Sequence, residues 1–179
     1  DLGVLAVQIV SPCVGVAMGE RNAKVATRTG DDGYTGLLGD GRVAKWEPRL
    51  EAIGALDEAT SALGLARAQV TTPEIGPAIL AMQQDLYLLM GELATPAENY
   101  EKVGLRVGEG HVARLDGQLE AFKARVRIGN QFIIPGATIA GAALDLARTI
   151  VRRAEREVAR PLHDGTIANR ETLRYLNRA

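Results

Sequence analysis

A glycine-rich stretch near the N-terminus carries residue types that could hold a phosphate group. It runs from Thr27 to Lys45 and contains five glycines, three threonines and three basic residues. Glycine lets backbone N–H groups approach an anion closely, and successive N–H groups can form an anion-binding nest. Arg28, Arg42 and Lys45 could add positive charge to phosphate oxygens. The stretch predicts a phosphate cradle, with a solvated loop before a helix as the alternative.

This stretch does not match the common nucleotide-binding motifs. A Walker A loop requires a glycine followed by lysine and then Ser or Thr, and no glycine of the stretch precedes a lysine. A dinucleotide fingerprint requires a buried strand and a βαβ unit, whereas the residues that follow have a helical pattern. Nucleotide binding by this loop would therefore lie outside these folds.

A second concentration of charge lies on the helix that we expect to begin at Thr138, its N-cap. Residues three or four positions apart share a helix face, and one such seam is polar: Asp145, Arg148, Arg152 and Glu155, flanked by Arg153 and Arg156. It lies between two apolar seams: Leu144, Ala147, Val151, Ala154 and Val158, and then Leu146 and Ile150. Two apolar faces predict burial on two sides, by the chain's own bundle and by another subunit.

The arginines of the polar seam could bind a polyphosphate. Arg148, Arg152 and Arg156 follow one another at intervals of one turn and would form a fork-like array. Glu155 could orient an arginine or help to hold Mg²⁺. A solvated charged face is the alternative interpretation.

Helices must position these residues, and apolar spacing predicts four more of them. They cover about 48–70, a helix capped by Thr72-Pro73 and ending at Pro96, a helix with a seam over 112–126, and a last helix from near Thr166. That last pattern has no stop signal at Ala179, so we expect the natural helix to continue. Asp57 follows Ile53 by one turn, and it either shares a partly buried face or lies at the edge of the apolar stripe.

An apolar loop, Phe132 to Gly136, interrupts the helical pattern before Thr138. Phe132 is most simply interpreted as a core residue that plugs the bundle. The alternative is a wall of an apolar ligand pocket.

Length, net charge and cysteine content limit the possible domain organisation, partners and compartment. The 179 residues predict a single domain, 1–179, with a flexible arm at 1–23, a nucleotide-binding loop at 24–47 and a helical bundle at 48–179. A net charge of −1 gives the whole protein no attraction for nucleic acid or an anionic membrane. The apolar run at 4–17 is too short for a membrane span. The single cysteine, Cys13, indicates a reducing, cytoplasmic compartment.

Five separated motifs resemble the ATP:corrinoid adenosyltransferases of the propanediol-utilisation type, in the same order and spacing. The likeness covers roughly residues 24–179. Its motifs are TRTGDDGxTG with RVxK from Thr27, EAxGxxDE from Glu51, FIIPG from Phe132, ARTIVRRAER from Ala147 and YLNR from Tyr175.

The resemblance implies an all-α fold, an up-and-down five-helix bundle of the ferritin-like type with an irregular N-terminal arm and a glycine-rich loop. It also implies a homotrimer with ATP bound between subunits. One wall of the ATP site would be Thr27, Arg28, Thr29, Gly30, Thr35, Gly36 and Lys45. The neighbouring subunit would supply Arg152, Arg153, Glu155, Arg156 and Asn177, with Glu155 as the Mg²⁺ contact.

The resemblance places other residues on the corrinoid side. Asp57 and Arg148 match an acid–arginine pair between subunits, and Phe132 matches an apolar residue that displaces the lower axial ligand of the corrinoid. The sequence departs from the family pattern at Thr60, where asparagine is common, and at Ala137, where a second glycine is usual.

The implied reaction transfers the 5′-deoxyadenosyl group of ATP to the cobalt of cob(I)alamin and releases triphosphate. The implied partners are a cobalamin reductase and an adenosylcobalamin-dependent mutase, with no nucleic acid and no membrane. Two alternatives remain open at this point. One is an ATP-binding bundle with another acceptor, and the other is a non-catalytic protein that stores or delivers adenosylcobalamin.

Overall fold

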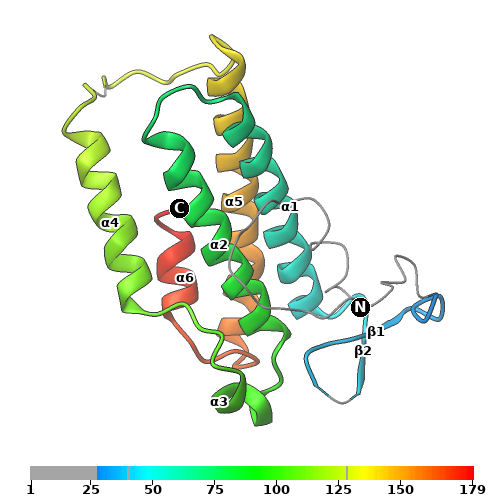
Figure 1. Cartoon of the computed structure of the whole chain (residues 1–179). Coiled ribbons are helices and arrows are strands. Elements are labelled where there is room, and N and C mark those ends of the chain that lie inside the picture. Colours follow the sequence, from blue (N-terminus) through cyan, green and yellow to red (C-terminus); the bar gives the residue numbers. More distant parts are fainter. Residues whose placement is uncertain (1–27, 40, 128) are drawn as a thin grey trace, which may run out of the picture.

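A computed structural model describes residues 28–39, 41–127 and 129–179 as a helical bundle with a small hairpin at one end (Figure 1). In chain order the elements are β1 Tyr34–Gly36, β2 Arg42–Ala44, α1 Pro48–Gln69, α2 Ile75–Ala94, a 3₁₀ turn at Ala97–Asn99, α3 Tyr100–Val103, α4 Glu109–Lys123, α5 Ile139–His163 and α6 Glu171–Leu176. The predicted all-α bundle is confirmed, with α3 as a single extra turn. The predictions for residues 1–23, Cys13 and Thr27 lie outside the described residues.

The centre of the bundle is the antiparallel pair of α1 and α5 (Figure 1). Small residues on both helices are almost completely buried, including Ala59 on α1 and Ala154 on α5. Small side chains let two helix axes approach closely. The predicted apolar seam of α5 is confirmed, since Ala147, Val151, Ala154 and Val158 all belong to the buried core.

α2 packs on the other side of α1, while α6 packs against α5 and α4. The predicted final helix therefore exists, but it begins at Glu171 rather than near Thr166, because Asp164 first caps a turn. Its carboxylate accepts hydrogen bonds from the backbone N–H and the hydroxyl of Thr166, at 3.0 and 2.6 Å. Such local side-chain bonds compete with helix formation.

Two other helix boundaries differ from the prediction. α2 begins at Ile75, and the Thr72 hydroxyl does not cap it; only the Thr72 carbonyl takes part, accepting a bond from the Ile75 N–H at 3.2 Å. α4 ends at Lys123, so Val126 lies outside the helix and is 60% exposed. By contrast, Thr138 caps α5 as expected, accepting from the Gly141 N–H at 3.0 Å.

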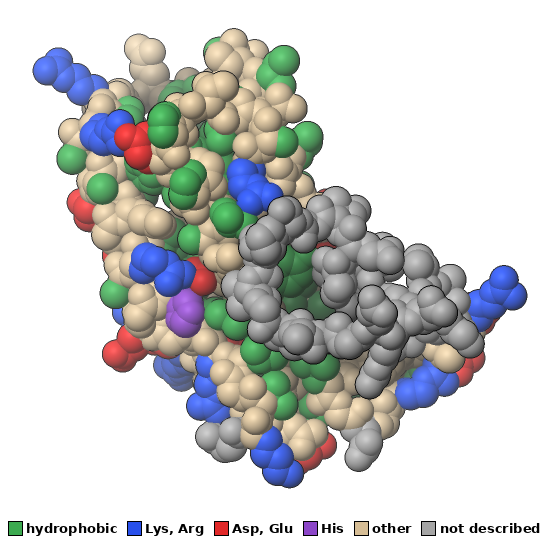
Figure 2. Space-filling view, in the orientation of Figure 1, with side chains coloured by type: hydrophobic (Ala, Val, Ile, Leu, Met, Phe, Trp, Pro, Cys, Tyr) green, Lys and Arg blue, Asp and Glu red, His purple; other side chains and the backbone are tan. Residues whose placement is uncertain are grey.

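The surface carries mixed charge. On the face in Figure 2, Lys and Arg side chains lie among Asp and Glu side chains rather than forming a continuous basic surface. Among the described residues, no helix combines the length and the hydropathy that a membrane span requires.

Candidate active site

Arg42, the first residue of β2, holds the glycine-rich loop in shape. Its guanidinium donates to both carboxylate oxygens of Asp32 at 2.7 Å, and to the carbonyl oxygens of Thr29 and Tyr34 at 2.5 and 2.8 Å. The hydrogen bond from Arg42 lowers the pKa of the Asp32 carboxyl below its ordinary value of 3.8. Arg42 therefore stabilises the loop itself, and both of its terminal nitrogens are already bonded to loop oxygens.

Lys45 lies against Gly30 at the base of the hairpin. Its Nζ donates to the Gly30 carbonyl at 2.7 Å and, as an ammonium group, has two further N–H bonds to offer. A Cβ on residue 30 would lie 2.8 Å from that Nζ and 3.3 Å from the Tyr34 carbonyl oxygen, so the close approach favours glycine. The exposed Arg28 adopts a left-handed backbone, with φ of 59°. The structure thus brings together Gly30 and Lys45, two residues of the predicted loop wall.

The remaining loop residues of the prediction lie on β1. Thr35 pairs with Val43, and Gly36 pairs with Arg42, in the antiparallel hairpin. Both are half-buried. A Cβ at Gly36 would make only an ordinary contact of 4.0 Å, so packing within this chain does not require glycine there.

The arginines of the α5 polar seam have different partners. Arg148 donates to Asp145 on its own helix at 3.0 Å, and Arg153 pairs with Glu58 of α1. Arg156 donates to the Arg152 carbonyl at 2.9 Å. The Arg152 side chain is exposed and has no hydrogen bond or ion pair to any of the described residues. Of the seam arginines, Arg152 therefore has its whole guanidinium available for a ligand.

Glu155 and Asn177 meet between α5 and α6. The Asn177 side-chain amide donates to one Glu155 carboxylate oxygen at 2.8 Å, and no described residue bonds to the other oxygen. The described residues contain no cluster of three or more His, Cys, Asp or Glu side chains that could hold a metal alone. Mg²⁺ commonly takes one or two carboxylates together with substrate phosphates. A single carboxylate at Glu155 fits that mode of binding.

The residues predicted for the corrinoid side are exposed in the single chain. Asp57 projects from α1 without a described partner, which supports the edge position over the partly buried one. Phe132 has an exposed fraction of 104%, so the interpretation as a core plug is wrong. The loop that carries it crosses from α4 to α5 beyond the helix ends (Figure 1), and the described residues leave the Phe132 side chain exposed.

Several apolar side chains in the Phe132 loop and near the start of α5 are exposed. Ile133 and Ile134 in the loop are 86% and 88% exposed, and Ile139 and Leu146 at the start of α5 are 75% and 49% exposed. Ile139, Leu146 and the half-buried Ile150 share one helix face. Exposed apolar surface of this kind marks interaction sites. Of the second apolar seam predicted for α5, Leu146 is exposed, whereas Ile150 is partly buried and packs against the core.

One chain does not bring the two predicted walls together. The bonds of Arg42 and Lys45 to described residues all end within the loop, and the hairpin extends from the base of α1 (Figure 1). The Glu155–Asn177 contact lies instead between α5 and α6. A second chain would be needed to oppose the walls.

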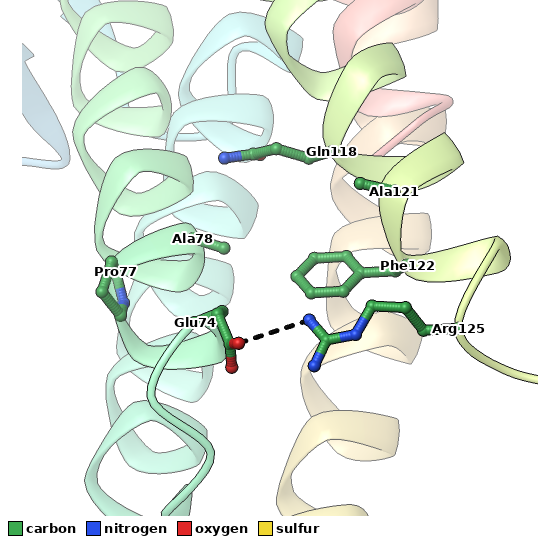
Figure 3. A pocket seen from close by; sticks show the side chains of 7 residues that line it. All are labelled: Glu74, Pro77, Ala78, Gln118, Ala121, Phe122 and Arg125. Atoms are coloured by element: carbon green, nitrogen blue, oxygen red, sulfur yellow. Dashed lines mark hydrogen bonds and ion pairs between the residues drawn. The ribbon is translucent and has the colours of Figure 1, made fainter.

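Two cavities between α2 and α4 are separate from the predicted site residues. The larger is about 410 Å³, and Figure 3 shows Phe122 of α4 and Pro77 of α2 on its walls, with the Glu74–Arg125 ion pair of 3.4 Å at one side. The other is about 270 Å³ and is mainly lined by apolar residues, including Ile79 and Met82. Neither cavity includes a residue predicted for phosphate or corrinoid.

Sequence reasoning missed Glu58, the partner of Arg153. Glu58 directly precedes the buried pair Ala59 and Thr60, so it lies at the edge of the apolar face of α1. That position is a signal for an ion pair across a helix interface, but it does not identify the partner. Thr60 itself faces the core, where its hydroxyl donates to the Leu56 carbonyl at 2.9 Å.

Comparison with known proteins gives a consistent result. The family model described as cobalamin adenosyltransferase matches residues 25–179. A corrinoid adenosyltransferase from Citrobacter freundii is 36% identical over 87% of this chain and 88% of its own length. A cobalamin adenosyltransferase from Cupriavidus metallidurans is 40% identical over 90% and 84% of the two chains.

Solved structures agree with these relatives. A variant PduO-type ATP:corrinoid adenosyltransferase from Lactobacillus reuteri, complexed with cobalamin and ATP, superposes with a TM-score of 0.79. It is 31% identical, over 87% of this chain and 86% of that chain. A second variant of the same type, complexed with ATP, gives a TM-score of 0.77 at 30% identity, over 86% of each chain.

Proposed function

Because the chain belongs to the cobalamin adenosyltransferase family, we propose that it transfers the 5′-deoxyadenosyl group of ATP to the cobalt of cob(I)alamin. The products are adenosylcobalamin and triphosphate. The observation that carries this proposal is the Arg152 guanidinium, which has no partner among the described residues. It lies one turn from the Glu155–Asn177 contact, on the same helix as the exposed apolar face.

In this reaction the residues of the chain position the substrates and neutralise phosphate charge; they do not transfer protons. In the reaction the Co(I) electron pair forms the Co–C5′ bond, the C5′–O bond breaks, and triphosphate leaves with that bond's electrons. Lys45 from the loop and Arg152 from α5 hold the phosphates, align C5′ and offset the charge that develops on the leaving group. Arg28, Thr29, Arg153 and Arg156 complete the phosphate contacts. The redox chemistry belongs to the corrinoid.

Magnesium would be held by Glu155 together with the ATP phosphates. Mg²⁺ would supply charge neutralisation of the triphosphate when bound. Asn177 holds one oxygen of Glu155 at 2.8 Å and so orients the other toward the ligand. Thr35, Gly36 and Gly30 keep the loop close to the nucleotide.

The corrinoid side is built from Asp57, Arg148 and Phe132. In our proposal Asp57 of one subunit pairs with Arg148 of the next, because Asp57 has no described partner and Arg148 holds only a surface contact with Asp145. Phe132 projects fully from its loop and takes the place of the lower axial ligand. Four-coordinate cobalt is then easier to reduce to the Co(I) state.

A homotrimer brings the two walls together in this proposal. The face around Leu146 and Ile139 packs on a neighbour, whose hairpin then faces Arg152. A cyclic trimer uses the same contact three times and so covers this face on every subunit. A reductase that supplies Co(I) and a mutase that consumes adenosylcobalamin are the partners that the reaction requires.

The test is incubation of the purified chain with ATP, Mg²⁺ and chemically reduced cobalamin. We expect the absorbance of the cobalt–carbon bond to appear with one triphosphate released per adenosylcobalamin. ATP binding without that product would contradict the proposal and indicate another acceptor. Tight binding of adenosylcobalamin with no ATP binding would indicate storage or delivery.

A further inference from the structure

Two buried acidic residues of α2 contact the two ends of the region around α6. Asp85 and Glu92 are 5% and 2% exposed, and they lie seven residues apart on one face of α2. α6 has six residues, Glu171–Leu176. A helix this short is not stable by itself, so its position depends on contacts with the rest of the protein.

Glu92 accepts hydrogen bonds from three groups of other segments. They are the Tyr100 hydroxyl, the Val107 backbone N–H at 3.1 Å and the Asn169 side-chain amide at 2.8 Å. A buried carboxylate needs such partners, and here it has them on both sides. The same Asn169 amide also donates to the Val107 carbonyl at 2.8 Å. Glu92 thus joins the α2–α4 connection to the residues that precede α6.

Asn169 in turn sets the first turn of α6. Its side-chain oxygen accepts from the Glu171 N–H at 3.1 Å, and its backbone carbonyl accepts from the Thr172 hydroxyl at 2.6 Å. The Thr172 side chain is buried. The start of α6 is therefore fixed to α2 through one asparagine.

Asp85 holds the other end. Its carboxylate accepts from the hydroxyl of the buried Tyr175 at 2.8 Å and forms an ion pair with Arg114 of α4. His111 of α4 lies 4.0 Å from the other carboxylate oxygen. Burial, and then the hydrogen bond with Asp85, raise the pKa of the Tyr175 hydroxyl, which stays protonated as the donor. Two residues later Asn177 donates to Glu155.

We propose that Asp85 and Glu92 are positioning residues for the ATP site: by fixing α6 to α2 they place the Asn177 amide against Glu155. The inference rests on the proposed function, since Glu155 and Asn177 act there as the Mg²⁺–phosphate side of the site. Neither acid contacts the nucleotide. Their effect on ATP passes through Asn169 and Tyr175 to α6.

The test uses Glu92→Gln and Tyr175→Phe, each of which removes a contact with little change in volume. We expect the dissociation constant for Mg·ATP to rise about tenfold, the worth of one hydrogen bond to a charged group, while kcat at saturating ATP changes less. Hydrogen exchange of residues 171–177 should become faster. Glu98→Gln is the matched control, because Glu98 is exposed and has no described partner.

A further variant separates positioning from general destabilisation. Asn177→Ala should raise the dissociation constant for Mg·ATP, as the positioning variants do. Unchanged ATP affinity in Glu92→Gln and Tyr175→Phe, with or without a lower Tm, would overturn the inference. If the wild type binds ATP but forms no adenosylcobalamin, the proposed function fails, while the affinity and exchange measurements still decide the positioning role.

Discussion

At the scale of single residues, the arginines of α5 differ in what they already hold. Arg153 pairs with Glu58 and Arg148 with Asp145, so both have intramolecular partners in the free chain. Arg152 has none among the described residues, and its exposed guanidinium is ready for a bidentate phosphate contact. The proposal therefore assigns it the largest share of triphosphate binding.

We expect Arg152→Ala to lower kcat/KM for ATP by about 10- to 100-fold, since a charge-assisted hydrogen bond to phosphate is lost. Arg152→Lys should lie between this variant and the wild type, because lysine keeps the charge but not the planar fork. Arg160→Ala, on the same helix and also exposed, is the control. ATP kinetics of Arg152→Ala equal to those of the control would remove Arg152 from the site.

Asp57→Ala and Arg148→Ala should act on the corrinoid. We expect each to raise KM for cob(I)alamin several-fold while the Mg·ATP dissociation constant stays within about twofold, because the pair lies on the corrinoid side. Glu58→Ala is the matched comparison, because Glu58 is adjacent to Asp57 but pairs with Arg153. It should change the dissociation constant for Mg·ATP rather than KM for cob(I)alamin. Equal losses for both substrates in Asp57→Ala would contradict this division.

At the scale of elements, the hairpin is ordered by one ion pair, Asp32 and Arg42. The pair is exposed, but Arg42 also bonds to two loop carbonyls. Because folding lowers the pKa of Asp32, the pair stabilises the loop above the ordinary value of 3.8, and the contribution is lost as the pH falls through the lower folded value. Trp46, the single tryptophan, packs edge-on against Tyr34 in the same hairpin, with ring centroids 5.7 Å apart.

Tryptophan emission reports on this loop. We expect Asp32→Asn at pH 7 to shift the emission of Trp46 toward that of the wild type at a pH low enough to protonate Asp32, because asparagine copies the protonated carboxyl. Asp31→Asn, exposed and without a described partner, should leave it unchanged. Far-UV circular dichroism checks that the bundle stays folded. An Asp32→Asn spectrum identical to that of the wild type at pH 7 would show that the pair does not order the hairpin.

The element scale also shows what the sequence could and could not predict. The seam of α5 and its Thr138 cap were readable, because apolar spacing and a capping hydroxyl act locally. Arg42 was considered as a possible phosphate contact because its bonds to Asp32 and two carbonyls depend on how the loop folds and cannot be read from the sequence. Asp85 and Glu92 are adjacent in sequence to apolar stripe residues of α2, and that position indicates that both acids are buried. Their partners could not be identified, because they lie up to 90 residues away in the sequence.

At the scale of the whole molecule, the five-helix bundle was predictable and the exposed state of Phe132 was not. From sequence, an apolar loop is expected to pack on the core of its own chain. Only the three-dimensional structure shows that Phe132 does not do so. The uncovered face around Ile139 and Leu146 agrees with the second apolar seam read from the sequence. The proposed trimer is what gives that face a partner.

Leu146→Glu should therefore disrupt assembly. A charge placed in an apolar contact between subunits is costly to bury, so we expect the trimer to dissociate at micromolar concentration and activity to fall with it. Val103→Glu, an exposed apolar position at the end of α3, is the control. Sedimentation measures both, and a Leu146→Glu variant that sediments like the wild type would place the interface elsewhere.

The central claim is that each ATP site takes its loop from one subunit and its arginines from the next, and mixing of two impaired variants tests it most directly. Lys45→Ala damages the loop wall and Arg152→Ala the α5 wall. After the two are unfolded together and refolded at equal amounts, random assembly leaves about a quarter of the sites with both walls intact. We predict that adenosylcobalamin formation returns to about a quarter of the wild-type rate. A mixture no more active than its separate components would contradict the shared site.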